Sequence, residues 1–336
     1  MVAFNFSRTP SPSRSGVDLC IIGNLTIDVI MRGIDELPGW GHEALSSART
    51  ESVAGQAGGL AFAGAALGVR TGVVADVGAD DAGARIRREL SDAGVGVQAI
   101  SVVPGGITPL TVAVVRADGE RAFLSDLGRL RRVDIETTAR QQPQIFDASV
   151  VALVGTSNLA GIDLRGAAGV LARARREGAL SVFDPGWDAQ GWTEKSVKDI
   201  RAVLLETDVF LPNLDEARAL TGRTELSEVF AGLSSFVSGV VIVKDGERGS
   251  YAVVDGEVIL AEAIRTEVDN AVGAGDVFDA GVIAGYLRGR DVVASVALGT
   301  AAASLYVARR QNRFPSFEEV EGLAQRVNTS VLEEWP

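Results

Sequence analysis

The sequence predicts an α/β fold in which a mostly parallel central sheet is covered by helices and a small β-sheet lid lies beside it. Three observations support this prediction. Short apolar runs recur along the chain, as expected for strands buried on both faces. Helical patterns lie between these runs. Two further segments have the alternating or turn-containing patterns of exposed strands, which a fully parallel sheet would not contain.

The apolar runs are short and bounded by glycine or aspartate, as expected for buried strands. They occur in the stretches 18–24 (DLCIIGN), 71–78 (TGVVADVG), 148–155 (ASVVALVG), 180–185 (LSVFDP), 208–213 (DVFLPN) and 240–246 (VVIVKDG). Helical patterns follow at 58–68, 81–94, 164–178 and 214–222. Because β and α segments alternate, we expect parallel strands joined by crossover helices.

The lid is predicted from residues 25–55 and 103–127, approximately. Asn24, Thr26 and Asp28 alternate with apolar neighbours, so they share one face of a strand. The stretch 110–125 (LTVAVVRADGERAFLS) has two β-prone runs around Asp118-Gly119, which predicts a hairpin.

One domain is expected over residues 17–330. Residues 1–16 contain no continuous apolar run, so we expect a flexible tail rather than a signal peptide, and we expect residues 331–336 to form a second tail. No apolar run reaches the ~18 residues that a membrane-spanning helix needs. A soluble, cytoplasmic protein without a membrane partner is the expectation.

Composition excludes several functional classes. The 336 residues are 46% hydrophobic and carry a net charge of −12, whereas nucleic-acid binders usually present a basic face. The one cysteine, Cys20, excludes a disulfide within the chain, and the one histidine, His42, excludes a site with several histidine ligands. A Ser-His-Asp triad would need His42, which lies in a loop rich in proline and glycine.

The stretch 269–281 (DNAVGAGDVFDAG) raises the sharpest functional question. Apolar residues recur every four positions after Asp276, which predicts a buried helix that begins near Gly275–Asp276. Free N–H groups and the helix dipole make such a start favourable for an anion, and glycines allow a phosphate to approach. Alternatively, Asp276 could simply cap the helix.

Three other stretches allow both a structural and a functional interpretation. Asn213 and Glu216 have the spacing of a capping box, but the pair could also hold Mg²⁺ through water or contact phosphates. Residues 240–254 (VVIVKDGERGSYAVV) predict a hairpin whose glycines would leave room for a nucleotide. The glycine-rich stretch 52–68 has neither the G-x-G-x-x-G spacing nor the P-loop pattern, which disfavours an NAD-dependent dehydrogenase.

The order of these stretches resembles the ribokinase-like (PfkB-type) carbohydrate kinases over nearly all of residues 17–330. The resemblance lies in GNLTID, LPGWGHE, AGQAGGLAFAGAALG, VGADDAG, FDP, PNLDEA, VKDGERG and, most diagnostically, NAVGAGDVFDAG. It implies a three-layer α/β/α sandwich with a β lid over a sugar site. It also implies Mg²⁺-dependent transfer of the γ-phosphoryl group of ATP to a primary hydroxyl, and a homodimer that pairs through the lid.

The resemblance also implies roles for particular residues. Asp276 is the expected catalytic base, and Gly273, Ala274 and Gly275 the expected anion hole. The remaining implied roles are substrate binding by Asn24, Asp28, Gly55, Gly58 and Gly59, nucleotide binding by Asn213, Lys244, Gly246 and Gly249, and metal contacts by Glu216 and Asn213. Because Asp276 would lie at a helix start, we expect a low pKa and a weak base, which suits a late proton transfer.

The chain departs from the family pattern at several positions. Gly59 stands where an asparagine normally contacts the substrate, and Ala54 stands where a first glycine is usual. Gly186-Trp187 follows FDP, and either Trp187 or Trp40 could stack on a sugar or base. Relatives can hold K⁺ near an Asp-Thr-Thr stretch, which reads Asn-Ala-Val at 270–272 here and so disfavours K⁺ activation.

We therefore expect a sugar or sugar-acid kinase. A nucleoside kinase of the same family is the alternative, and a non-catalytic sugar- or nucleotide-binding relative is a second one, which the retained Asp276 disfavours.

Overall fold

The computed structural model describes residues 5–13, 16–118, 120–128, 147–159, 163–188, 191–237, 239–254, 256–268, 271–309 and 313–332. Within them, one large sheet has the strand order β14-β13-β12-β11-β10-β9-β8-β1-β4-β5. Pairing is parallel from β11 through to β5 and antiparallel among β11, β12, β13 and β14. The strand bounds are β1 Leu19–Ile22, β4 Thr71–Gly78, β5 Ile100–Val103, β8 Val150–Val154, β9 Leu180–Asp184, β10 Val209–Phe210, β11 Val240–Lys244, β12 Gly249–Val254, β13 Glu257–Glu262 and β14 Thr329–Val331.

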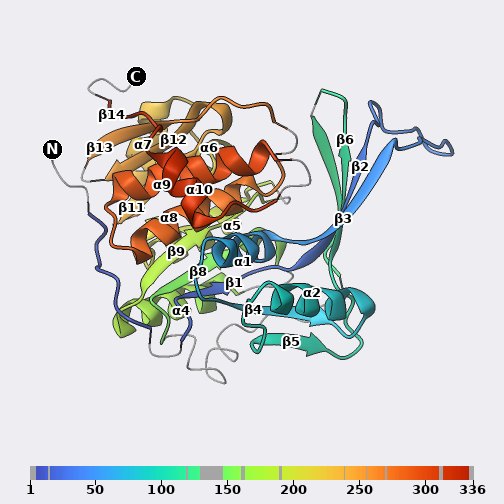
Figure 1. The fold of residues 1–336 in the computed structure, drawn as a ribbon, viewed down its shortest axis with the longest axis horizontal. Helices are drawn as coiled ribbons and strands as arrows, with labels where there is room; N and C mark the ends of the chain where they lie inside the picture. The colour runs from blue at the N-terminus through green and yellow to red at the C-terminus, as the bar shows by residue number, and fades with distance from the viewer. Residues whose placement is uncertain are drawn as a thin grey trace.

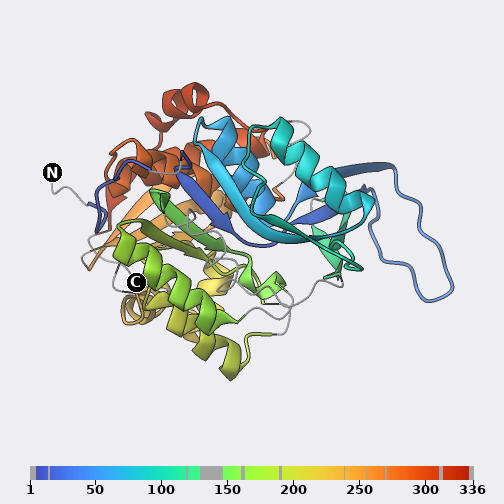
Figure 2. The same ribbon diagram turned by 90° about the horizontal axis from the view of Figure 1, so that it is seen from below.

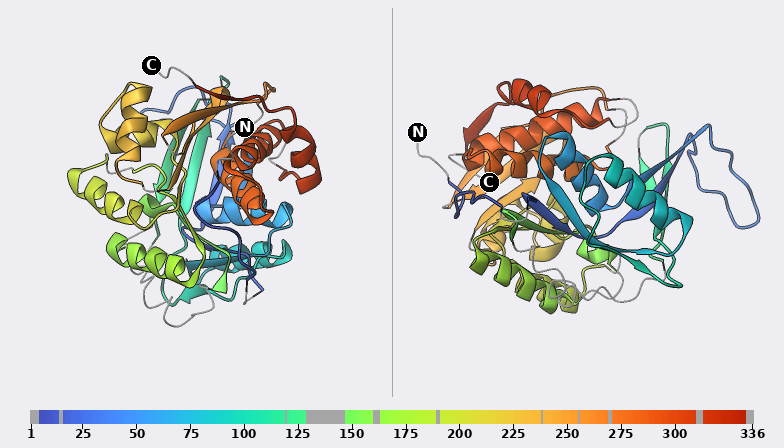
Figure 3. Two further views of the ribbon diagram at one scale, coloured as in Figure 1. Left: turned by 90° about the vertical axis from the view of Figure 1, so that its left-hand side faces the viewer. Right: turned by 60° about the horizontal axis from the view of Figure 1, so that its bottom comes forward.

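Helices cover both faces of this sheet, as Figures 1 and 3 show. One face packs against α1 Gln56–Ala66, α2 Asp81–Asp92, α8 Ala274–Leu287, α9 Val292–Val307 and α10 Phe317–Ala324. The other packs against α4 Leu164–Glu177, α5 Glu194–Leu204, α6 Leu214–Thr221 and α7 Leu226–Ser234. Strand residues alternate between the two hydrophobic clusters, since successive side chains of a strand point to opposite faces. The predicted three-layer α/β/α architecture is confirmed.

A second sheet stands apart from the main body on the right of Figure 1. Its order is β3-β2-β6-β7, and its strands are β2 Thr26–Arg32, β3 Ala48–Ala54, β6 Leu110–Val115 and β7 Arg121–Asp126. These strands fall inside the two ranges predicted for the lid. The loop between β2 and β3 extends beyond the sheet in Figure 2 and carries the fully exposed Trp40.

Both predicted hairpins are present. β6 pairs antiparallel with β7, and β11 pairs antiparallel with β12 through the short 3₁₀ helix Gly246–Arg248. Gly119, at the turn of the first hairpin, lies outside the described residues.

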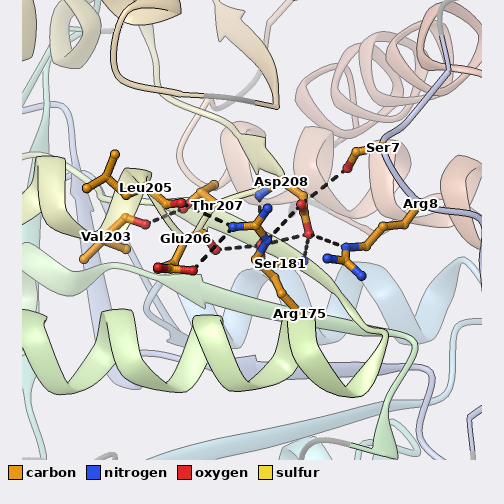
Figure 4. A network of polar contacts seen from close by, with 9 residues as sticks. All are labelled: Ser7, Arg8, Arg175, Ser181, Val203, Leu205, Glu206, Thr207 and Asp208. Atoms are coloured by element: carbon orange, nitrogen blue, oxygen red, sulfur yellow. Dashed lines mark hydrogen bonds and ion pairs between the residues drawn. The ribbon is translucent and has the colours of Figure 1, made fainter.

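The N-terminal segment differs from the flexible tail expected over residues 1–16. Phe6 packs edge-to-face on Tyr286 of α8, with ring centroids 5.1 Å apart. Arg8 Nε lies 3.1 Å from a carboxylate oxygen of the buried Asp208, and Ser7 Oγ donates to the same carboxylate (Figure 4). Two buried anchors, one aromatic and one ionic, therefore hold residues 5–13 against the body, which the polar composition did not reveal.

At the other end of the chain, β14 pairs with β13, so Val331 belongs to the sheet although it was assigned to the C-terminal tail. Among the described residues, no helix is long and apolar enough to cross a membrane.

Candidate active site

The carboxyl ends of the parallel strands bring five of the singled-out segments to one edge of the sheet. Asn24 follows β1, Gly155 follows β8 and Asp184 ends β9. Asn213 follows β10, and Lys244 ends β11. Residues separated by more than two hundred positions in the sequence therefore lie around a common edge, which is where open α/β sheets bind their ligands.

The helix predicted from the stretch 269–281 is α8. It begins at Ala274, with Gly273 as its N-cap at a φ of 82°, so Gly273 adopts the left-handed conformation that glycine tolerates best. Asp276 is the third helical residue and does not cap the helix, so the interpretation of Asp276 as a cap is wrong. Ala274 N–H donates to Ala271 O at 3.3 Å. Asp269 and Asn270 lie outside the described residues.

A buried ammonium lies beneath this helix start. Lys244 Nζ is 2.8 Å from Asp184 Oδ2 and 3.1 Å from Asp279 Oδ1. Asp279 lies one turn after Asp276 on α8, and its side chain is 2% exposed. A Cβ placed on Gly275 would lie 3.5 Å from Lys244 Nζ, so the lysine reaches the first turn itself. These contacts tie α8 to the ends of β9 and β11.

The electrostatics of Asp276 differ from the expectation of a low pKa. Burial raises the pKa of Asp276 well above its usual range, the nearby Asp184 raises it further, and Lys244 lowers it only in part. The field of the helix start favours a carboxylate, but desolvation and neighbouring negative charge outweigh it here. The sequence prediction of a low pKa is therefore wrong, and Asp276 is a stronger base than expected.

Asn213 and Glu216 form a complete capping box at the start of α6. Asn213 Oδ1 accepts from Glu216 N–H, and Glu216 Oε2 accepts from Asn213 N–H, both at 2.9 Å. Glu216 is buried, and burial together with the charge of Asp184 raises its pKa to about 7. The structural interpretation of the pair is thus confirmed, and the box fixes both side chains next to the acidic group around Lys244.

The donor set suits a hard divalent cation. Asp184, Glu216, Asp276 and Asp279 surround Lys244 with more negative than positive charge, and carboxylate oxygens are the ligands that Mg²⁺ prefers. Among the described residues, no three acidic, histidine or cysteine side chains are grouped closely enough to hold a metal ion by themselves.

The residues expected to hold the acceptor lie between β1, the lid and α1. Asp28 on β2 is partly buried, burial raises its pKa, and Thr26 Oγ1 donates to its carboxylate at 2.7 Å. Asn24 is buried, and its Oδ1 accepts from Gln56 N–H at 3.2 Å. The Asn24 side-chain oxygen therefore stabilises the start of α1. Among the residues expected to bind the acceptor, Asp28 on strand β2 of the lid is the one that carries a carboxylate.

The glycines of this region have different surroundings. Gly55 has a φ of 82°, and a Cβ there would lie 3.0 Å from the backbone carbon of Asn24. A Cβ on Gly58 would make an ordinary contact of 3.5 Å with Leu25. A Cβ on Gly59 would lie 3.0 Å from Asp276 Cγ and closer still to Oδ2, so the second turn of α1 lies directly against the Asp276 side chain.

The glycines expected beside the nucleotide also differ. Gly246 has a φ of 54° and open space around its Cα. A Cβ on Gly249, whose φ is 107°, would collide with the backbone of β13 at Ala261. Gly249 is therefore required by the packing of the β11–β12 hairpin on β13, and only Gly246 faces open space.

Asp184 and Asp279 are the site residues that the sequence analysis did not assign. Both lie inside the motifs that carry the family resemblance, and Asp279 has a usable signal, since it is a charged residue within the apolar part of α8, whose residues 277–286 are all buried. Of the two tryptophans, Trp187 is half exposed three residues after the end of β9, whereas Trp40 lies at the far tip of the lid loop. Trp187 packs against Trp192, with ring centroids 5.9 Å apart.

The family described as "pfkB family carbohydrate kinase" matches residues 18–319. The chain belongs to this family. It is 30% identical to an ATP-dependent ribose-1-phosphate kinase of Halopiger xanaduensis over 304 residues, which cover 87% of this chain and 92% of the relative. It is 29% identical to a nucleoside kinase of Methanothermobacter thermautotrophicus, over 86% of this chain and 89% of the relative.

Solved structures agree on the fold. The ribokinase of Arabidopsis thaliana, solved with ribose and ATP, has a TM-score of 0.79 and 22% identity, covering 92% of this chain and 99% of its own. An E. coli structure solved with ATP and Mg²⁺ has a TM-score of 0.78 and 21% identity, with the same coverage of both chains. The protein is thus a PfkB-type kinase with the ribokinase fold.

Proposed function

We propose that the protein is an ATP-dependent kinase that transfers the γ-phosphoryl group to a primary hydroxyl of a sugar or sugar acid. The observation that carries the proposal is the position of Asp276 in the first turn of α8. There a carboxylate with a raised pKa lies beside the backbone N–H groups of a helix start. This arrangement combines a proton acceptor with an anion site, as in-line phosphoryl transfer requires.

In the proposed reaction the acceptor oxygen attacks the γ-phosphorus, the bond from that phosphorus to the β,γ-bridging oxygen breaks, and Asp276 takes the hydroxyl proton. The raised pKa makes Asp276 a better proton acceptor than an ordinary aspartate. Gly273, Ala274 and Gly275 would direct backbone N–H groups at the transferred phosphoryl, as other helix starts do with phosphates. Lys244 holds α8 in place through Asp279.

Bound Mg²⁺ would neutralise charge on the phosphates. Glu216 and Asn213 would hold it through water, and the excess of negative charge around Lys244 supports a cation there. Lys244, Gly246 and Gly249 would border the nucleotide. The Asn-Ala-Val sequence at 270–272 disfavours activation by K⁺, which a comparison of rates in K⁺ and Na⁺ buffers tests.

Asp28 on β2 of the lid would bind acceptor hydroxyls together with Asn24, while Gly55 and Gly58 line the pocket wall. Closure of the lid would exclude water, which could otherwise accept the phosphoryl group. A nucleoside acceptor is the second candidate. It is supported by the 29% identity to a nucleoside kinase and by the half-exposed Trp187 near the site edge, which offers a surface for a planar base.

We also place a homodimer contact on the lid. Leu110 and Leu124 are exposed and share one face of this sheet, because Leu124 pairs with Val112 two residues from Leu110. An exposed apolar face of this kind is typical of an interface. Light scattering of wild-type protein and of Leu124→Glu should show a dimer and a monomer, respectively.

The proposal is tested with Asp276→Asn. Purified wild-type and variant proteins are assayed for Mg²⁺-dependent ATP consumption with sugars, sugar acids, ribose 1-phosphate and nucleosides, and the product is identified by ³¹P NMR. We expect the variant to bind MgATP and to lose about 10²–10⁴-fold in kcat, the contribution typical of a general base. The exposed Asp92→Asn on α2 is the matched control.

Near-wild-type turnover in Asp276→Asn would contradict the proposed role of this residue. MgATP binding without any phosphorylated product across the whole panel would favour a non-catalytic binding protein.

A further inference from the structure

The second turn of α1 and the first turn of α8 meet at Gly59 and Asp276. A Cβ placed on Gly59 would lie 3.0 Å from both Cβ and Cγ of Asp276 and nearer still to Oδ2. Non-bonded carbon atoms pack at about 3.5–4.0 Å. We propose that Gly59 is a positioning residue, whose missing side chain seats the Asp276 carboxylate against the backbone of α1. The proposal rests on the function of Asp276 as the base.

The backbone at Gly59 cannot easily retreat from this contact. Asn24 Oδ1 holds the first N–H of α1, and Gly59 N–H donates to Gly55 O at 2.8 Å. The flanking residues Leu60 and Ala61 are buried in the main core. A side chain at position 59 would therefore displace its neighbour rather than the helix that carries it.

Asp276 is fixed from the other side by its own helix. Lys244 holds Asp279, one turn further along α8, and lies against Gly275, one residue before Asp276. Since both helices are anchored, an added methyl group is accommodated by rotation of the Asp276 side chain together with a small shift of its Cβ, and both move the carboxylate out of its present position.

The contact is particular to Gly59. The adjacent Gly58 has room for a Cβ, with Leu25 at 3.5 Å. In the family pattern, an asparagine that contacts the substrate stands at position 59. In this chain the position serves to seat the carboxylate, and the acceptor must be oriented by other groups, of which Asp28 on the lid strand is the charged one. We expect Gly59→Asn to displace the Asp276 side chain, so this substitution would not simply restore the family's substrate contact.

The test compares Gly59→Ala with Gly169→Ala, which replaces a glycine inside helix α4 where a Cβ meets nothing within 4 Å. Both substitutions favour the helix. We expect Gly59→Ala to keep its KM for MgATP within about twofold of wild type and to lose about 10²-fold in kcat, a loss that a displacement of ~1 Å can cause. Gly169→Ala should retain wild-type kinetics.

A wild-type kcat in Gly59→Ala would overturn the proposal, whereas the proposed function would stand if Asp276→Asn remained inactive. Should Gly59→Ala instead lower the melting temperature, the same substitution is made in Asp276→Gly, where Cβ, Cγ and Oδ2 are all absent. The loss in melting temperature should then largely disappear. Persistence of the full loss in that background would show that Gly59 does not seat the carboxylate.

Discussion

Lys244 and Asp184 join the ends of β11 and β9 through an ion pair of 2.8 Å in which both side chains are largely buried. Burial alone would lower the pKa of Lys244, but Asp184 and Asp279 raise it, so the ammonium stays charged. It is the one cation in contact with this part of the described site, where three further carboxylates crowd around it. The positive charge of Lys244 therefore offsets part of the negative charge of the surrounding carboxylates.

Lys244→Met is expected to lower the free energy of unfolding by about 3–5 kcal/mol at pH 8, because it leaves buried carboxylates without their counter-charge. Urea titrations measure the effect. The deficit should shrink as the pH falls, since burial raises the pKa of Asp279 and this carboxylate can then become neutral. Lys195→Met removes an exposed i,i+4 pair with Asp199 and should change stability by less than ~0.5 kcal/mol. An equal effect of the two substitutions would show that the buried pair contributes no more than a surface pair.

The contacts of Lys244 show which features of the fold and the site could be predicted from the sequence and which could not. Strand and helix periods predicted both helix layers, and Asn213 with Glu216 formed a capping box because that motif is local. The pairing of Lys244 with Asp279 spans 35 residues and that with Asp184 spans 60, so no local pattern contains it. The raised pKa of Asp276 depends on the same convergence, which explains why the helix start alone predicted the wrong direction.

The pH dependence of activity should reveal this environment. Burial and Asp184 raise the pKa of Asp276, Lys244 lowers it, and Asp28 raises it further. A base must be ionised, so kcat/KM should rise with pH through a pKa above the ordinary aspartate value of about 3.9. Asp28→Asn removes one negative charge and should move this acidic limb to lower pH, whatever it does to acceptor affinity. If the acidic limb of the pH profile is at the same pH in Asp28→Asn as in the wild type, the charge of Asp28 does not affect the pKa of the ionising group.

The stability of the protein should depend on pH in the opposite direction to its activity and fall as the pH rises. Glu216 has a folded-state pKa of about 7 against an ordinary 4.5, so the folded state binds the proton more tightly. Its contribution to stability is full below pH 4.5 and is lost as the pH rises through about 7. Glu216→Gln should therefore remove part of the decline in stability between pH 5 and 8, measured by urea unfolding. An unchanged slope would mean that Glu216 is ionised throughout.

Gly273 offers a test of the anion hole. Its φ of 82° disfavours any side chain, and a Cβ there would also lie 3.0 Å from the Tyr306 hydroxyl. Gly256 is the matched control, because it has a φ of 81° but nothing within 4 Å of a Cβ. Gly256→Ala should cost about 1–2 kcal/mol from backbone strain alone. Gly273→Ala should cost more and should also weaken catalysis, whereas Gly256→Ala should not.

Tyr306→Phe separates the two causes, since it removes the hydroxyl and leaves the ring at an ordinary distance of 3.6 Å. In that background the costs of Gly273→Ala and Gly256→Ala should become equal in urea titrations, while the loss of kcat in Gly273→Ala should persist. If the excess cost of Gly273→Ala remained, the contact with Tyr306 would not be its source.

The N-terminal segment should contribute measurable stability through Asp208. This carboxylate is buried and lies 3.1 Å from both Arg8 Nε and Arg175 Nε, while Ser181 donates to it from its N–H and hydroxyl groups. Arg8→Ala leaves the carboxylate paired with Arg175 and should cost about 1 kcal/mol. Asp208→Ala leaves the buried N–H of Ser181 without its acceptor, whereas Arg175 keeps Glu206, and should cost about 1–3 kcal/mol. Both are measured by urea unfolding, with the exposed Arg70→Ala as the control for a surface pair.

In the double variant Arg8→Ala/Asp208→Ala, the Arg8 substitution should cost nothing further, because its partner is already absent. A full additional cost in that background would show that Arg8 stabilises the fold through contacts other than Asp208. Phe6, packed on Tyr286 of α8, would then be the remaining anchor of the segment, and Phe6→Ala in the same double variant should release residues 5–13 to proteolysis.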